Sequence, residues 1–173
     1  MLAALSAEPT ALACGILGAI CLMTWPLFRT RAAMLLVQLG IGVGFGLHYA
    51  LLEIATAALV NVLGAVQIAA ALLFGTNPWL RWIGYALVPA IAGACLVTWH
   101  GLPSLLSASG MALIALGRVQ VIPSSMRILV LSGCPFWLAH DLIIGSPLAV
   151  VDALSLLTGA VALGRQAVHQ PAE

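Results

Sequence analysis

Residues 32–52 read AAMLLVQLGIGVGFGLHYALL, an apolar stretch that contains no Asp, Glu, Lys or Arg. An apolar stretch of about 17–25 residues crosses a bilayer as a helix, because a helix satisfies its own backbone polar groups within hydrocarbon. Arg31 stands immediately before this stretch and Glu53 immediately after it, so charged residues mark both of its ends. We therefore predict a transmembrane helix over residues 32–52.

Six further stretches of the same kind occupy most of the remaining chain. The seven predicted spans are residues 10–28, 32–52, 55–74, 80–98, 102–117, 127–144 and 148–164. The connections between them are short and carry charge or turn residues, for example Gly145, Ser146 and Pro147 before the last span. The sequence predicts an all-α integral membrane protein with seven transmembrane helices, folded as a single membrane domain over residues 1–173.

The composition supports this class of protein and excludes others. Of the 173 residues, 63% are hydrophobic and 6% are charged, and the mean hydropathy is +1.16. Soluble domains carry about a quarter charged residues, so a soluble enzyme is excluded, as is a disordered segment. Six arginines against five acidic residues leave no basic face for a nucleic acid. The chain has no lysine, which excludes a Schiff base and a lysine nucleophile.

The cysteines give no sign of a disulfide framework or a zinc site, which would need loop cysteines at fixed spacing. All four fall within predicted spans, at Cys14, Cys21, Cys95 and Cys134. We interpret them as buried apolar thiols. We predict no cofactor and no metal site.

The arginines predict the orientation in the membrane. If seven spans are threaded alternately, all six fall on one side, namely Arg29, Arg31, Arg81, Arg118, Arg127 and Arg165. The opposite side carries Glu8 and Glu53. Loops rich in arginine face the cytoplasm, so we predict an outside N-terminus and a cytoplasmic C-terminus. Residues 1–9 lack the basic segment of a cleavable signal peptide, and we expect the first span to remain as an anchor.

Two similar segments indicate an internal repeat. FGLHYALLE begins at Phe45 and WLAHDLIIG begins at Trp137, so an aromatic residue precedes a histidine by three positions in each. We predict two three-helix repeats, residues 10–74 and 102–164, joined by a linker helix at 80–98. The extra crossing of the linker gives both repeats the same orientation, as in transporters built from parallel repeats.

The repeat brings polar side chains to one level of the membrane. These are His48, Asn61, His140 and Asp152, at roughly 6–9 Å below the outer boundary by helical rise. Asp141 adjoins His140 and is expected nearer the surface. Polar groups at membrane depth are costly unless they pair or face a water-filled cavity, so we predict a substrate-binding site here. Trp137 lies beside this layer and could stack on a ligand.

Each of these residues also has a purely structural interpretation. A histidine one turn from a helix end can bond a neighbouring carbonyl, and Asn61 can join two helices. Asp152 is the strongest functional candidate, because the spans supply it with no basic partner. Gln38, Gln67 and Ser132 form a weaker inner set of polar residues.

The predicted second span carries a glycine face, and two spans contain proline. The face consists of Gly40, Gly42, Gly44 and Gly46, which allow close approach of another helix within the bundle or at a homo-oligomer interface. Pro26 and Pro135 fall inside the first and sixth spans and indicate possible kinks.

Several segments resemble the YgjV-type bacterial inner-membrane proteins. They are residues 47–67 (LHYALLEIATAALVNVLGAVQ), 98–101 (TWHG), 115–120 (ALGRVQ) and 136–147 (FWLAHDLIIGSP). The resemblance implies a location in the bacterial inner membrane. The three-one-three plan is also similar to SWEET and PQ-loop transporters of sugars and other small metabolites, although the chain lacks a Pro-Gln dipeptide. That likeness implies pocket positions at Asn61 and Asp152.

These observations favour a transporter or facilitator of a small polar solute, sugar-like or another metabolite, that binds between the two repeats. A non-transporting inner-membrane assembly or regulatory component is the alternative. A metal-dependent membrane enzyme is a third hypothesis, although the chain contains neither HExxH nor GxSxG.

Overall fold

The computed structural model describes residues 9–53, 55–74, 77, 79, 81–97, 99 and 101–169. Glu8, which the orientation argument used, lies outside this part. The described residues form seven α-helices and one turn of 3-10 helix. These are α2 (Pro9–Thr24), η1 (Trp25–Leu27), α3 (Arg31–Leu51), α4 (Ala55–Phe74), α5 (Arg81–Val97), α6 (Leu102–Arg118), α7 (Pro123–Ile144) and α8 (Leu148–His169). The all-helical prediction is confirmed.

Local sequence explains where the helices begin and end. The hydroxyl of Thr30 accepts a hydrogen bond from the amide of Ala33 and caps the start of α3. Gly145 ends α7 in the left-handed conformation, at φ 67°, which glycine adopts without steric cost. Pro26 does not kink a longer first helix, because α2 ends at Thr24 and the proline lies in η1.

The start of α7 differs from the sequence prediction. The helix begins at Pro123 rather than at residue 127, because a proline with its fixed φ is favoured in the first turn of a helix. Arg127 therefore belongs to α7 and not to a loop, and its side chain is 2% exposed.

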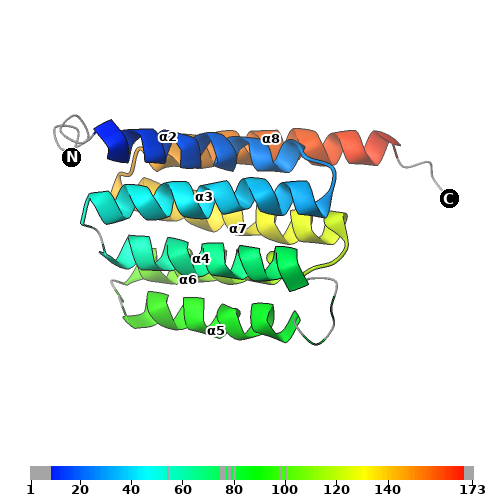
Figure 1. Ribbon diagram of the computed structural model, residues 1–173. Helices are drawn as coiled ribbons and strands as arrows, with labels where there is room; N and C mark the ends of the chain where they lie inside the picture. Colours follow the sequence, from blue (N-terminus) through cyan, green and yellow to red (C-terminus); the bar gives the residue numbers. More distant parts are fainter. Residues whose placement is uncertain are drawn as a thin grey trace.

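The helices form two layers (Figure 1). The first layer contains α2, α3 and α4, and the second contains α8, α7 and α6 in the corresponding order. α5 packs against α4 and α6 at one edge, and α2 packs against α8 at the other. The two middle helices, α3 and α7, therefore stand on opposite sides of the bundle interior.

The surface of the bundle is apolar. Within the part of the chain that the structure describes, four helical segments are long and apolar enough to cross a membrane: Pro9–Leu27, Arg31–Leu51, Pro123–Ile144 and Leu148–Arg165. Among the described residues, the shorter apolar segments are Ala57–Leu73, Gly84–Gly93 and Leu102–Arg118. Large hydrophobic side chains such as Leu73, Trp82 and Val97 point outward, as lipid contact requires. Seven membrane crossings stay a prediction.

The glycines of α3 allow its neighbours to approach closely within the bundle. Gly40 and Gly44 face α2, whereas Gly42 and Gly46 face α4. Helix contacts within the chain therefore explain all four glycines. A homo-oligomer that forms through this face stays a prediction.

We expect Gly44→Ala to destabilise the contact between α2 and α3. A methyl group at Gly44 would lie 2.7 Å from the backbone nitrogen of Gly18 and 2.9 Å from the carbonyl oxygen of Cys14, and backbone atoms cannot move aside locally. Overpacking of this kind costs about 1–3 kcal/mol, which a lower melting temperature in detergent would report. Gly46→Ala is the matched control, since its methyl group would lie 3.7 Å from the Cβ of Asn61. Equal melting temperatures for both variants would contradict the expectation.

Candidate functional site

A cavity of about 590 Å³ lies between the two layers. Every described helix except α5 contributes to its lining, together with η1. Its polar lining residues are Gln38, Tyr49, Asn61, Ser104, Ser107, Arg118, His140, Asp141, Ser146 and Asp152. Of the five binding residues predicted from sequence, the structure places four in the lining: Asn61, Trp137, His140 and Asp152. Sites for small molecules in proteins commonly have volumes of about 300–1,000 Å³, so the cavity can hold a metabolite.

The two ends of the cavity differ in charge. The acidic end is the end where α7 connects to α8, and it holds Asp141 and Asp152, which are 5% and 7% exposed. The arginine end is the end where α6 connects to α7; Arg118 lines the cavity there, and Arg31 and Arg127 lie at the same end of the bundle outside the cavity lining.

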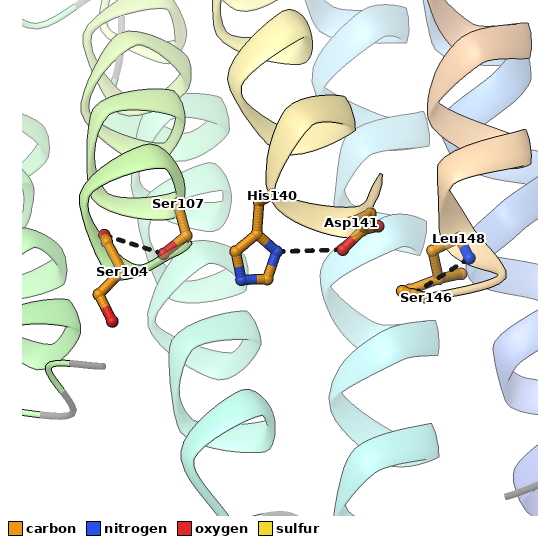
Figure 2. A network of polar contacts seen from close by, with 6 residues as sticks. All are labelled: Ser104, Ser107, His140, Asp141, Ser146 and Leu148. Carbon is orange, nitrogen blue, oxygen red and sulfur yellow. Dashed lines mark hydrogen bonds and ion pairs between the residues drawn. The ribbon is translucent and has the colours of Figure 1, made fainter. Parts of the chain in front are cut away.

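At the acidic end, His140 and Asp141 form a hydrogen-bonded pair. The Nδ1 of the imidazole lies 3.1 Å from the Oδ1 of Asp141. Figure 2 shows the ring between this carboxylate and the face of α6 that carries Ser107. Trp137, one turn earlier on α7, contacts the imidazole edge-on at 5.4 Å between ring centroids. The Asp141 contact and the indole together hold the imidazole against the cavity.

The acidic end holds two carboxyl groups rather than one. Asp141 of α7 and Asp152 of α8 both line the cavity here and are both buried. The expected position of Asp141, nearer the membrane surface than His140, stays a prediction. The left-handed turn at Gly145 returns the chain into α8 and packs the end of α7 against it.

The two residues from the first layer have structural partners. The Nδ1 of His48 lies 2.8 Å from the carbonyl oxygen of Ala11, and the imidazole packs on Gly15. His48 is not among the cavity-lining residues, and its bond to a carbonyl of α2 agrees with the purely structural role considered for it from the sequence. Asn61 does line the cavity, while its amide donates within α4 to the carbonyl of Ala57 at 2.9 Å.

A buried arginine lies deeper in the cavity, and sequence reasoning missed it. Arg118 was assigned to a loop, but it is the last residue of α6 and is 7% exposed. Helical side chains tilt toward the N-terminus of their helix, which for α6 means into the bundle. The guanidinium donates from Nε to the Oε1 of Gln38 at 3.0 Å, and from NH1 to the Oε1 of Gln67 at 3.5 Å.

This arrangement corrects two sequence-based interpretations. The spans do supply a buried basic group, and two members of the weaker inner set, Gln38 and Gln67, are its partners. The third member, Ser132, is exposed and bonds the carbonyl of Leu129. No carboxylate in the described part of the chain forms an ion pair with Arg118.

The arginine end is closed by hydrogen bonds between the layers. Arg31 of α3 donates to the carbonyl of Ala71 at the end of α4, and also to the carbonyls of Arg118 and Gln120 at the end of α6. Arg127 of α7 donates to the carbonyl of Phe28, between η1 and α3. Arginine at helix C-termini satisfies carbonyls that the helix leaves unpaired. These bonds hold the two layers together at this end.

An apolar helical bundle with buried ionisable residues defines the class of this chain as a helical membrane protein. The family model Imp-YgjV, described as bacterial inner membrane protein, matches residues 10–169. The chain therefore belongs to this family of bacterial inner-membrane proteins. No curated protein and no solved structure shows significant similarity to it.

Proposed function

We propose that the protein is a transporter or facilitator of a small polar solute, which binds in the cavity between the two layers. The cavity itself carries this proposal, because it joins both layers and contains charged groups that face neither lipid nor bulk water. Burial of such groups is costly and is typical of substrate and ion pathways in membranes.

In this proposal the two layers correspond to the two predicted repeats. Residues 10–74 correspond to α2, α3 and α4, and residues 102–164 correspond to α6, α7 and most of α8. α5 is the linker helix that packs at the edge of both. A transporter of parallel repeats works by rocking one repeat against the other around a shared site, and the cavity between the layers is the place for that site.

The arginines give the proposed orientation, with the arginine end in the cytoplasm and the acidic end outside. The cavity lining reaches the outside end at Ser146 and Leu148. The bonds of Arg31 across the layers close the cytoplasmic end. Breaking these bonds is the movement that would open the cavity inward.

In this scheme Asp152 and Asp141 bind the solute at the outer end, and His140 holds Asp141 in place. Asn61 and Trp137 contribute an amide and an aromatic wall from opposite layers. The alternative, a non-transporting assembly or regulatory component, requires no such polar cavity. The described residues contain no group of three or more His, Cys, Asp or Glu that could hold a metal ion, and the proposal includes none.

A thiol placed in the cavity tests the proposal without knowledge of the solute. The variant is Ser107→Cys in a chain whose four native cysteines are replaced by Ala. We expect a charged, membrane-impermeant methanethiosulfonate to label this thiol both in right-side-out and in inside-out membrane vesicles, because alternating access exposes the cavity to each side.

Leu105→Cys in the same background is the control. Leu105 is 51% exposed on the outer surface of the same helix, and a thiol there would face lipid and react slowly in both preparations. Labelling of Ser107→Cys from one side only would favour a non-transporting component over a transporter.

A further inference from the structure

The inner part of the cavity presents hydrogen-bond donors without an anion. A guanidinium has five N–H donors, and among the described residues those of Arg118 bond two neutral amide oxygens. The Oε1 of Gln38 accepts from Arg118, and the buried Nε2 of the same amide has no hydrogen-bond partner in the described part of the chain. Buried donors without partners are rare, because each costs free energy. A guanidinium beside an unpaired amide donor is suited to bind a carboxylate.

The outer part of the cavity presents the opposite charge. Asp141 and Asp152 both line this end and are buried, so it presents two carboxyl groups to the cavity. Ser104 and Ser107 line the same end and add hydroxyl groups. A carboxylate with neighbouring hydroxyls is suited to bind an ammonium group.

A basic side chain lines one end of the cavity and two carboxyl groups line the other, so a solute with one negative and one positive group meets an opposite charge at each end. The helices also set the separation of the two ends. A Cβ atom added at Gly64 would lie 3.3 Å from the guanidinium of Arg118 and 4.0 Å from the side chain of Met111. The guanidinium therefore lies near Met111 of α6. Gly133 of α7 packs on the carbonyl of Gly110, which precedes Met111 on α6. Gly133 therefore lies at the same height in the bundle as the guanidinium.

Asp141 lies eight residues beyond Gly133 on α7, and its side chain tilts back toward the N-terminus of the helix. The guanidinium and the carboxyl pair are therefore separated by about 10 Å. Two hydrogen bonds of about 2.8 Å leave roughly 5 Å between the charged groups of a solute that contacts both ends.

We propose that the solute is a zwitterion whose carboxylate binds Arg118 and Gln38 and whose ammonium group binds the Asp141–Asp152 pair, with roughly 5 Å between the two. This inference rests on the proposed function for the location of the site. It adds the chemical class of the solute and its direction in the cavity.

Thermal unfolding of the purified full-length protein in detergent tests the inference. The probes are glycine, 4-aminobutyrate and 5-aminopentanoate, with pentanoate and pentylamine as ligands that carry one charge only. We expect 4-aminobutyrate or 5-aminopentanoate to raise the melting temperature by about 4 °C at about ten times its dissociation constant. Glycine, whose charges are closer together, and both singly charged ligands should give less than half of that shift. Equal shifts for the acid, the amine and the zwitterion, or no shift at all, would overturn the inference.

Arg118→Lys and Arg118→Gln locate the carboxylate. For both variants, 4-aminobutyrate should leave the melting temperature unchanged, or should raise it only at a tenfold higher concentration than the wild type needs. A wild-type shift in the melting temperature of Arg118→Gln would overturn the assignment. If neither variant folds, Gln38→Leu removes the unpaired donor and should weaken the response. If Ser107→Cys is labelled from both sides but no zwitterion binds, this inference fails and the proposed transport stands. If a zwitterion binds but Ser107→Cys is labelled from one side only, the proposed transport fails and this inference stands.

Discussion

Asp152→Asn is expected to abolish solute uptake while leaving the protein folded. Asparagine has nearly the same shape as aspartate, so the packing of α7 against α8 is retained and stability should change by less than about 1 kcal/mol. The variant removes one of the two carboxyl groups proposed to bind the solute, and losing such a partner for a buried charge corresponds to about 3 kcal/mol, or roughly a hundredfold in uptake. Uptake is measured in proteoliposomes supplied with a mixture of small polar metabolites, with mass spectrometry of the vesicle contents.

Glu53→Gln is the matched control for this variant. The described part of the chain has three acidic residues, and Glu53 is the one that is exposed and does not line the cavity. We expect Glu53→Gln to transport like the wild type. Wild-type uptake by a folded Asp152→Asn variant would show that the acidic end takes no part in binding.

Arg31→Leu is expected to have the largest effect on stability. Its guanidinium donates three hydrogen bonds to carbonyls at the ends of α4 and α6, at 2.6, 3.1 and 3.1 Å. Hydrogen bonds to charged groups contribute about 1.5–3 kcal/mol each. At this half-buried site, water can hydrogen-bond to the carbonyls that lose the guanidinium, so the net loss of stability is smaller than the sum of the three bonds. A net loss of about 3 kcal/mol predicts a melting temperature about 10 °C lower in detergent.

Arg29→Leu provides the comparison within the same loop. Arg29 is exposed and makes no side-chain hydrogen bond to the described residues, so its replacement should change the melting temperature by less than about 2 °C. Both variants remove one positive charge from the same end of the bundle. Equal destabilisation by the two would mean that the hydrogen bonds of Arg31 do not hold the layers together.

The helices could be predicted from the sequence because apolar length and breaking residues are local properties. Residues 32–52 and 148–164 fall almost entirely within α3 and α8. The start of α7 was misplaced because Arg127 was counted as a loop charge, whereas Pro123 is the stronger signal for a helix start. The packing of α2 on α8 could not be derived, because it depends on contacts between residues more than a hundred positions apart.

The acidic end of the candidate site could be predicted in part from the sequence, and the arginine end could not. Asp152 and His140 stood out as ionisable residues at membrane depth. Arg118 lies at a helix end, where arginine usually indicates the cytoplasmic side, and only its inward tilt places it in the cavity. Gln38 and Gln67 were the available signal, since two amides in the middle of apolar helices need a partner. His48 resembled His140 by spacing, but α2 covers it.

Uptake by wild-type proteoliposomes tests most directly whether the cavity is a solute pathway. The account predicts that at least one small polar metabolite accumulates in vesicles containing the wild-type protein and does not accumulate in protein-free vesicles. The same metabolite should be missing from vesicles that contain folded Asp152→Asn. If the wild-type and protein-free vesicles have the same contents across the whole mixture, transport through this cavity is contradicted.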